Sequence, residues 1–126
     1  MKGVPMASLF VVSGGDKVDY YPLGKRTTVV GRDEAVPVQV VDKQVSRKHM
    51  QIRLDKESEC YYATDMTSRN GVFINGRKIA AETVLADGDR IRIGDTDMLF
   101  TLKDFDDREN ALHNFKKVGE RRFSTS

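Results

Sequence analysis

Three polar segments of the chain carry the side chains that are best suited to bind an anion. They are residues 31–32, 45–49 and 65–71. Arginine presents forked N–H donors that match the oxygens of a phosphate, and serine and asparagine add short hydrogen bonds. A single arginine is most simply a solvated charge. Three such segments together, each next to a β-type run, indicate an anion-binding site.

No pattern typical of a catalytic site is found in the sequence. His49 lies in Ser46-Arg47-Lys48-His49, which resembles neither a Ser-His-Asp arrangement nor a nucleophile elbow. There is no Walker motif and no Gly-x-Gly-x-x-Gly, and the carboxylates are spread through loops. Cys60 is more typical of a small packed residue than of a nucleophile. We therefore expect no catalytic residues and no enzymatic activity.

The composition of the 126-residue chain excludes further classes of protein. One cysteine rules out an intramolecular disulfide and a cysteine-rich zinc site, and two histidines leave little for a histidine site, so we expect no metal and no cofactor. A net charge of +2 is too small to indicate nucleic acid binding by itself. No apolar run approaches the roughly 20 residues that span a bilayer, and residues 1–12 lack a signal-peptide layout. The expected protein is cytoplasmic and does not bind a membrane.

Short β-type runs separated by turn residues must position the three polar segments. Pro22 predicts an edge strand, and Asn75-Gly76 is the strongest hairpin signal. The predicted strands are residues 7–12, 18–23, 25–30, 38–40, 49–54, 61–64, 71–74, 77–79, 90–93 and 97–102.

Many short strands with Gly, Asn and Asp turns, and no helical period, predict an all-β sandwich. Alternate loops of a sandwich gather at one end. The residues that would meet there are Arg32, Ser46, Arg47, Arg69 and Asn70.

The character of the chain changes after Lys103. Residues 104–110 are acidic and residues 116–122 are basic, an order that suits the dipole of a helix. We expect a short helix over 107–118 with 119–126 unstructured, and a wholly disordered tail is the alternative. The predicted division is a domain at 1–103 and a C-terminal tail at 104–126.

Three motifs together resemble the forkhead-associated (FHA) domain family. They are Gly31-Arg32, Ser46-Arg47-Lys48-His49, and the segment 65–76, which follows Asp-x-x-Ser-x-Asn-Gly-x-x-x-Asn-Gly. The likeness extends more loosely from about Leu9 to Leu102 and does not include the tail. It implies an eleven-stranded β-sandwich with recognition loops at one end.

The resemblance also implies a role for each binding residue. Arg32 would meet a phosphate, and Ser46 would donate its hydroxyl to it. Arg47 would lie beside the phosphate or an adjacent acidic side chain, and Asn70 would hold the peptide backbone. Arg69 stands where family members often have Thr, so its contact with the phosphate would be longer and more electrostatic.

A second set of residues is expected to shape the loops rather than touch the ligand. These loop-scaffold residues are Gly31, His49, Ser68 and Gly71. Thr67 stands where the family commonly has Gly, which leaves the shape of that loop open.

The implied function is binding of phosphothreonine peptides without catalysis, as a signalling adaptor or scaffold downstream of a Ser/Thr kinase. The partner would be a phosphothreonine-containing protein, either such a kinase or its substrate. One alternative is a nucleic-acid binder that uses the basic loops and tail, which the low aromatic content of 8% and the absence of Trp oppose. The other is a phosphate-independent interaction domain, which the presence of Arg32 and Ser46 opposes.

Overall fold

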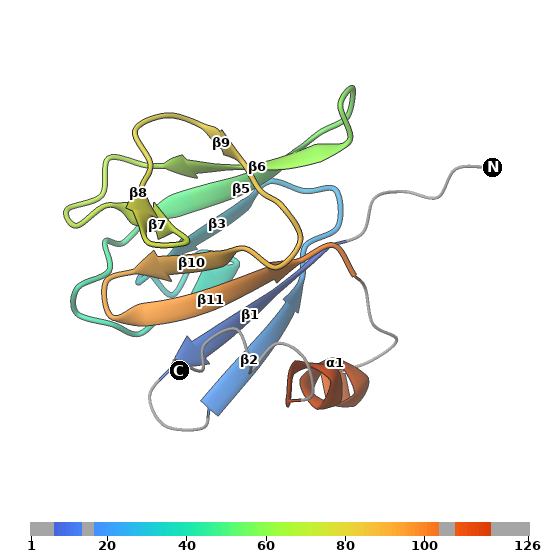
Figure 1. Cartoon of the computed structure of the whole chain (residues 1–126). Coiled ribbons are helices and arrows are strands. Elements are labelled where there is room, and N and C mark those ends of the chain that lie inside the picture. Colours follow the sequence, from blue (N-terminus) through green and yellow to red (C-terminus); the bar gives the residue numbers. More distant parts are fainter. Residues whose placement is uncertain (1–6, 14–16, 104–107, 117–126) are drawn as a thin grey trace.

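The computed structural model describes residues 7–13, 17–103 and 108–116, which form two β-sheets packed face to face and one short helix (Figure 1). The six-stranded sheet has the order β2-β1-β11-β10-β7-β8 and the five-stranded sheet has the order β4-β3-β5-β6-β9. Every strand pair is antiparallel except the parallel pair β3–β4. The expected all-β sandwich is confirmed.

The strands are short, as the turn residues predict. The six-stranded sheet consists of β1 (Ser8–Ser13), β2 (Lys17–Pro22), β7 (Val72–Ile74), β8 (Arg77–Lys78), β10 (Arg90–Ile93) and β11 (Thr96–Thr101). The five-stranded sheet consists of β3 (Thr28–Gly31), β4 (Val38–Gln39), β5 (Met50–Asp55), β6 (Cys60–Asp65) and β9 (Thr83–Val84).

Alternating apolar residues from both sheets form the core between them. Ile91 and Ile93 of β10 are buried, whereas Arg90 and Arg92 between and beside them are exposed. Tyr61 and Phe100 bridge the two sheets with an edge-to-face contact at 5.7 Å between ring centroids. This period of two is what allows one face of each strand to be buried while the other carries charge.

Two sequence signals for sheet edges and turns are confirmed, and one strand was not predicted. β2, which ends at Pro22, is an edge strand. Asn75 and Gly76 join β7 to β8 with φ angles of 51° and 85°, the left-handed pair of a tight hairpin. β9 was missed because it is two residues long and gains its pairing only from the neighbouring β6.

Helix α1 (Arg108–Asn114) packs against the outer face of the six-stranded sheet. Ala111 and Phe115 are buried there, and the Phe115 ring lies 5.1 Å from that of Phe10. The predicted helix over 107–118 is therefore confirmed in 108–114. Residues 107 and 117–118, and the predicted unstructured segment 119–126, lie outside the described residues. The division at 103/104 remains a prediction, because residues 104–107 also lie outside them.

The loops before β5, after β6 and between β10 and β11 lie at one end of the sandwich, at the left of Figure 1. The loop after β3 begins there too, because β3 runs antiparallel to β5 and therefore ends beside the start of β5. The predicted gathering of the polar segments is thus a property of the topology. Helix α1, as the structure describes it, is too short and too polar to cross a membrane.

Candidate functional site

The end of β3 is joined to the β4–β5 loop by backbone hydrogen bonds. The Arg32 amide donates to the Ser46 carbonyl at 3.0 Å, and the Asp33 amide donates to the Arg47 carbonyl at 3.2 Å. A Cβ atom at Gly31 would lie 2.0 Å from that Arg47 carbonyl oxygen. Only glycine fits at this close approach, which supports a scaffold role for Gly31.

His49 lies at the centre of the loops and is 0% exposed. The Ser46 amide donates to Nδ1 of His49 at 3.0 Å, so Nδ1 must be an unprotonated acceptor. Nε2 therefore carries the proton and donates to the Gly71 carbonyl at 2.7 Å. Because both ring nitrogens are used within the protein, His49 joins two loops and has no nitrogen left for a ligand.

The β6–β7 loop is shaped by short hydrogen bonds within the motif 65–71. Oδ1 of Asp65 accepts from the Ser68 amide at 2.9 Å, and the Ser68 hydroxyl oxygen accepts from the Gly71 amide at 2.9 Å. Gly71 has a φ of 86° and Thr67 a φ of 57°. Thr67 thus adopts a left-handed conformation that glycine would favour.

Among the described residues, Ser46 and Asn70 each have one polar group without a protein partner, while another of their groups bonds to a neighbouring loop. Oγ of Ser46 accepts from the Arg69 amide at 3.0 Å, which leaves its O–H available to donate to a ligand. Nδ2 of Asn70 donates to the backbone carbonyl of Gln44 at 2.8 Å and to its side-chain oxygen at 3.2 Å. Oδ1 of Asn70 is therefore the group that can accept an N–H from a bound chain.

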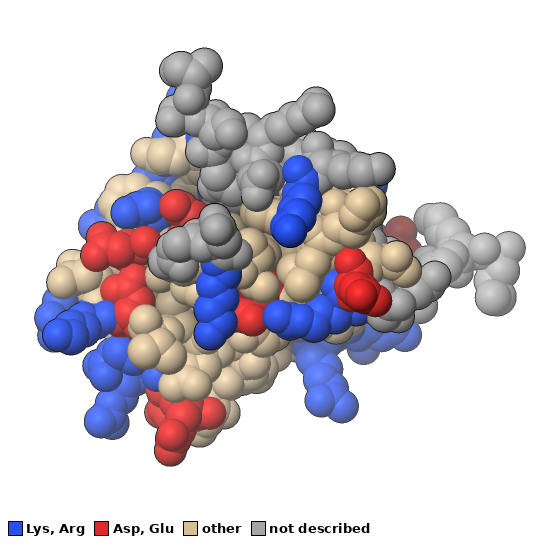
Figure 2. Space-filling view, turned by 90° about the horizontal axis from the view of Figure 1, so that it is seen from below, with Lys and Arg blue, Asp and Glu red and all other residues tan. Residues whose placement is uncertain are grey.

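The arginines of the loops are not paired with a carboxylate in the part of the chain that the structure describes. Nε of Arg32 donates to the Val45 carbonyl at 3.0 Å, which orients the guanidinium and leaves its Nη edge available. Over the ranges that the structure describes, Arg32, Arg47 and Arg69 form no ion pair. All three are exposed. Figure 2 shows Lys and Arg side chains along the left edge, where the loops lie, with Asp and Glu among them.

Asp42 ties a fourth loop to this end of the sandwich. Its Oδ1 accepts from the Gln44 amide at 2.8 Å, and its Oδ2 accepts from the Asp95 amide and the Thr96 hydroxyl, each at 2.8 Å. Partial burial raises the pKa of the Asp42 carboxyl, but these hydrogen bonds outweigh it and hold the pKa below its ordinary value. Asp42 is thus an ionised support beneath the β4–β5 loop.

The structure brings the sequence-predicted residues of all three segments into one site. Arg32, Ser46 and Asn70 present groups to solvent. Arg47 and Arg69 are placed by their backbone atoms, and their side chains extend outward. The residues expected to be scaffold make the internal contacts: Gly31, His49, Ser68 and Gly71.

Asp42 and Gln44 were missed by sequence reasoning. Asp42 accepts a hydrogen bond from the amide of Gln44, two residues on, in a turn that many Asp residues form. The sequence around Asp42 therefore does not distinguish it from other turn residues. In the described part of the chain, no group of His, Cys, Asp and Glu side chains is arranged to hold a metal ion.

Comparison with known sequences agrees with the family resemblance of the three motifs. The model of the FHA domain family matches residues 28–94. The FHA domain-containing protein FhaA of Mycobacterium tuberculosis is 33% identical over 82 residues, covering 65% of this chain and 15% of FhaA. The oxoglutarate dehydrogenase inhibitor of Corynebacterium jeikeium is 31% identical over 102 residues, covering 79% of this chain and 69% of that protein. The glycogen accumulation regulator GarA of Mycolicibacterium smegmatis is 32% identical over 102 residues, with coverages of 79% and 63%.

Solved structures give the same fold. A domain from a study of phosphothreonine-dependent FHA domain interactions superposes with a TM-score of 0.68 at 28% identity, covering 79% of this chain and 99% of that domain. Mycobacterium tuberculosis EmbR, in complex with a low-affinity phosphopeptide, superposes with a TM-score of 0.70 at 30% identity, covering 82% of this chain and 26% of EmbR. This chain therefore spans most of the isolated domains but a minor part of proteins such as FhaA and EmbR.

Proposed function

Because the chain belongs to the forkhead-associated (FHA) domain family, we propose that it binds phosphothreonine peptides as a non-catalytic adaptor or scaffold downstream of a Ser/Thr kinase. The observation that carries this proposal is the guanidinium of Arg32, which forms no ion pair within the described ranges and is held by the carbonyl of Val45, the residue before Ser46. Its partner would be a phosphorylated kinase or kinase substrate in the cytoplasm. Relatives studied with a phosphopeptide or for phosphothreonine-dependent interactions support the same assignment.

The proposed recognition rests on the match between a phosphate and these donors. A phosphothreonine carries about −1.5 to −2 charges at neutral pH and three strong acceptor oxygens. The Nη edge of Arg32 and the Ser46 hydroxyl would bind these oxygens, while Arg47 and Arg69 would add longer-range attraction. Oδ1 of Asn70 would accept a backbone N–H of the peptide. Because the loops already bond to one another, they need little ordering when the peptide binds.

The proposal is tested by screening an oriented phosphothreonine peptide library and measuring the best sequence by calorimetry. Binding of the phosphothreonine peptide and loss of binding after its dephosphorylation are the expected results. The phosphoserine version should bind at least about fourfold more weakly if the threonine methyl is buried, since one methyl is worth about 0.8 kcal/mol.

Two outcomes would overturn the proposal. Equal binding of the phosphorylated and unphosphorylated peptides would indicate a phosphate-independent interaction domain. Tight binding of random oligonucleotides together with no binding of any library peptide would instead favour a nucleic-acid binder.

A further inference from the structure

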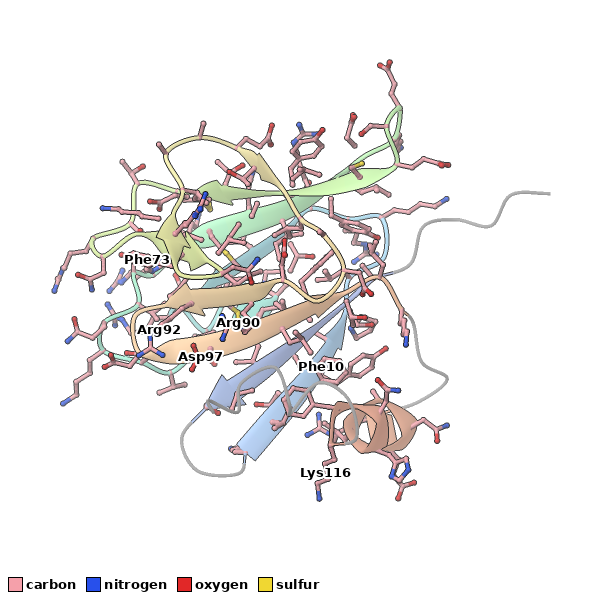
Figure 3. The ribbon with its side chains drawn as sticks, in the orientation of Figure 1. Phe10, Phe73, Arg90, Arg92, Asp97 and Lys116 are labelled. Atoms are coloured by element: carbon pink, nitrogen blue, oxygen red, sulfur yellow. The ribbon has the colours of Figure 1, made fainter. Side chains whose placement is uncertain are left out.

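A groove of about 420 Å³ lies on the outer face of the six-stranded sheet, and its lining includes none of the residues of the candidate binding site. We call it the outer groove; it is lined by Phe73, Gly76, Arg90, Ile91, Arg92, Gly94 and Asp97. Figure 3 shows the labelled side chains Phe73, Arg90, Arg92 and Asp97 along β7, β10 and β11. Gly76 and Gly94 lie in turns with φ angles of 85° and 55°, and the absence of side chains there helps to leave the face hollow.

The outer groove contains an aromatic side chain, Phe73, and a positive charge, Lys78, borders it. Phe73 is half-buried, and its cross-strand neighbours are Lys78 on β8 and Arg92 on β10, so a cation flanks the ring on each side. Arg92 is neutralised by Asp97, to whose two oxygens it donates at 3.0 Å each. Lys78 forms no ion pair with any residue that the structure describes. The unneutralised charge beside Phe73 therefore favours an acidic, partly apolar ligand.

Lys78 also connects the outer groove to the candidate binding site. A Cβ atom at Gly71 would lie 2.6 Å from Cε of Lys78, so the lysine side chain passes directly over the residue that follows Asn70. On the other side, a Cβ at Gly94 would lie 2.9 Å from Cγ2 of Val45, in the loop that carries Ser46. Neighbouring strands are about 4.8 Å apart and an extended chain advances about 3.3 Å per residue. A peptide leaving the site beside Asn70 would cross from β8 to β10 within roughly three residues.

We propose that the outer groove is a second docking subsite for an acidic segment with one apolar side chain, on the same partner that carries the phosphothreonine. This inference rests on the proposed function and adds a requirement on the sequence of the partner. The apolar side chain would lie against Phe73, and the acidic side chains would face Lys78. Because both parts of the ligand belong to one chain, the second contact forms at high effective concentration.

The experiment compares three forms of one phosphothreonine peptide by calorimetry. The first form is short, the second has a Gly-Ser extension, and the third has an extension of the same length with one Leu and three Glu residues. Each extension is placed at either end of the peptide in turn. We expect the acidic extension to bind about three- to tenfold more tightly than the Gly-Ser one at one end only, since exposed charge pairs contribute modestly. This gain should shrink in 0.5 M salt.

Variants separate the outer groove from a general effect of charge. Lys78→Glu should remove the gain and leave the affinity for the short peptide within about twofold. Lys56→Glu, in the exposed turn between β5 and β6, changes the net charge equally and should keep the gain. A fourth peptide carries Ser in place of the Leu of the acidic extension, and Phe73→Ala should abolish the difference in affinity between these two peptides.

The outcomes distinguish this inference from the proposed function. If the short phosphopeptide binds and the acidic extension adds nothing at either end, the docking subsite is wrong and the proposed function stands. An equal loss of the gain in Lys78→Glu and Lys56→Glu would also overturn the subsite, because it would reflect net charge alone. If no phosphopeptide binds, the proposed function itself fails.

Discussion

Arg32 at the loop end of the sandwich and Arg53 on the outer face of the five-stranded sheet are held by different kinds of acceptor. On that face, Arg53 donates to both carboxylate oxygens of Glu82, at 2.6 Å and 2.8 Å, and its guanidinium carbon lies 5.2 Å from the Tyr62 ring centroid. The hydrogen bond from Arg53 lowers the pKa of the Glu82 carboxyl. At the loop end, Arg32 is oriented by a carbonyl and pairs with no carboxylate of the residues that the structure describes.

This difference distinguishes a charge that serves the fold from one that is available to a ligand. The charges of Arg53 and Glu82 neutralise each other on the surface. Such exposed pairs contribute little to stability. Arg32 is held in one orientation by an uncharged acceptor, so its positive charge is not neutralised by that contact and can attract an anion. The contrast predicts that equal changes of charge at the two places have unequal effects on binding.

The largest expected effect comes from removing the oriented charge. Arg32→Ala should weaken phosphopeptide binding at least about 100-fold, because two charge-assisted hydrogen bonds of roughly 1.5–3 kcal/mol each are lost. Arg53→Ala is the matched control and should bind like the parent. Calorimetry gives both affinities, and thermal unfolding checks that both variants are folded. Similar affinities for the two variants would refute the assignment of Arg32 to the phosphate.

His49 offers a different comparison, between a buried and an exposed histidine. His49→Ala should lower the free energy of unfolding by about 3–5 kcal/mol, because it leaves a cavity and two unpaired polar groups, the Ser46 amide and the Gly71 carbonyl. His113→Ala, on the exposed side of α1, should change it by less than about 0.5 kcal/mol. Denaturant titrations measure both values.

The affinity of the His49→Ala variant for a phosphopeptide then shows whether His49 shapes the loops or contacts the ligand. Measured at a temperature where the variant is folded, binding should fall only as far as the loops loosen. A variant as stable as the parent that binds no phosphopeptide would make His49 a ligand contact.

Local chemistry explains which parts of the site could be predicted from the sequence. Ser46 and His49 are three residues apart, as are Asp65 and Ser68, and each pair is joined by a hydrogen bond. Alternation of apolar residues likewise revealed most strands. A motif of closely spaced residues therefore carries much of its own geometry.

Contacts between distant segments were beyond the reach of such patterns. The carboxylate of Asp42 accepts a hydrogen bond from the hydroxyl of Thr96, which lies 54 positions along the chain. The side chain of Lys78 passes over Gly71 only because β7 and β8 pair in one register. Ala111 is buried by the outer face of a sheet whose strands begin about 100 residues earlier. These depend on the register and packing of the whole sandwich, which no local window contains.

The smallest expected effect concerns backbone strain in two loops, one that belongs to the candidate binding site and one that does not. Thr67 in the β6–β7 loop and Glu59 in the β5–β6 turn both have positive φ angles, of 57° and 60°. A left-handed conformation costs an L-residue roughly 1–2 kcal/mol, and glycine avoids this at an entropic cost of about 0.5–1 kcal/mol. Threonine is branched at Cβ and is strained more than glutamate. Thr67→Gly should therefore raise the free energy of unfolding by about 0.5–1 kcal/mol, and Glu59→Gly should leave it nearly unchanged. Denaturant titrations of the two variants against the parent measure the difference. A loss of stability in Thr67→Gly would show that the threonine side chain stabilises the loop by more than its strained backbone costs.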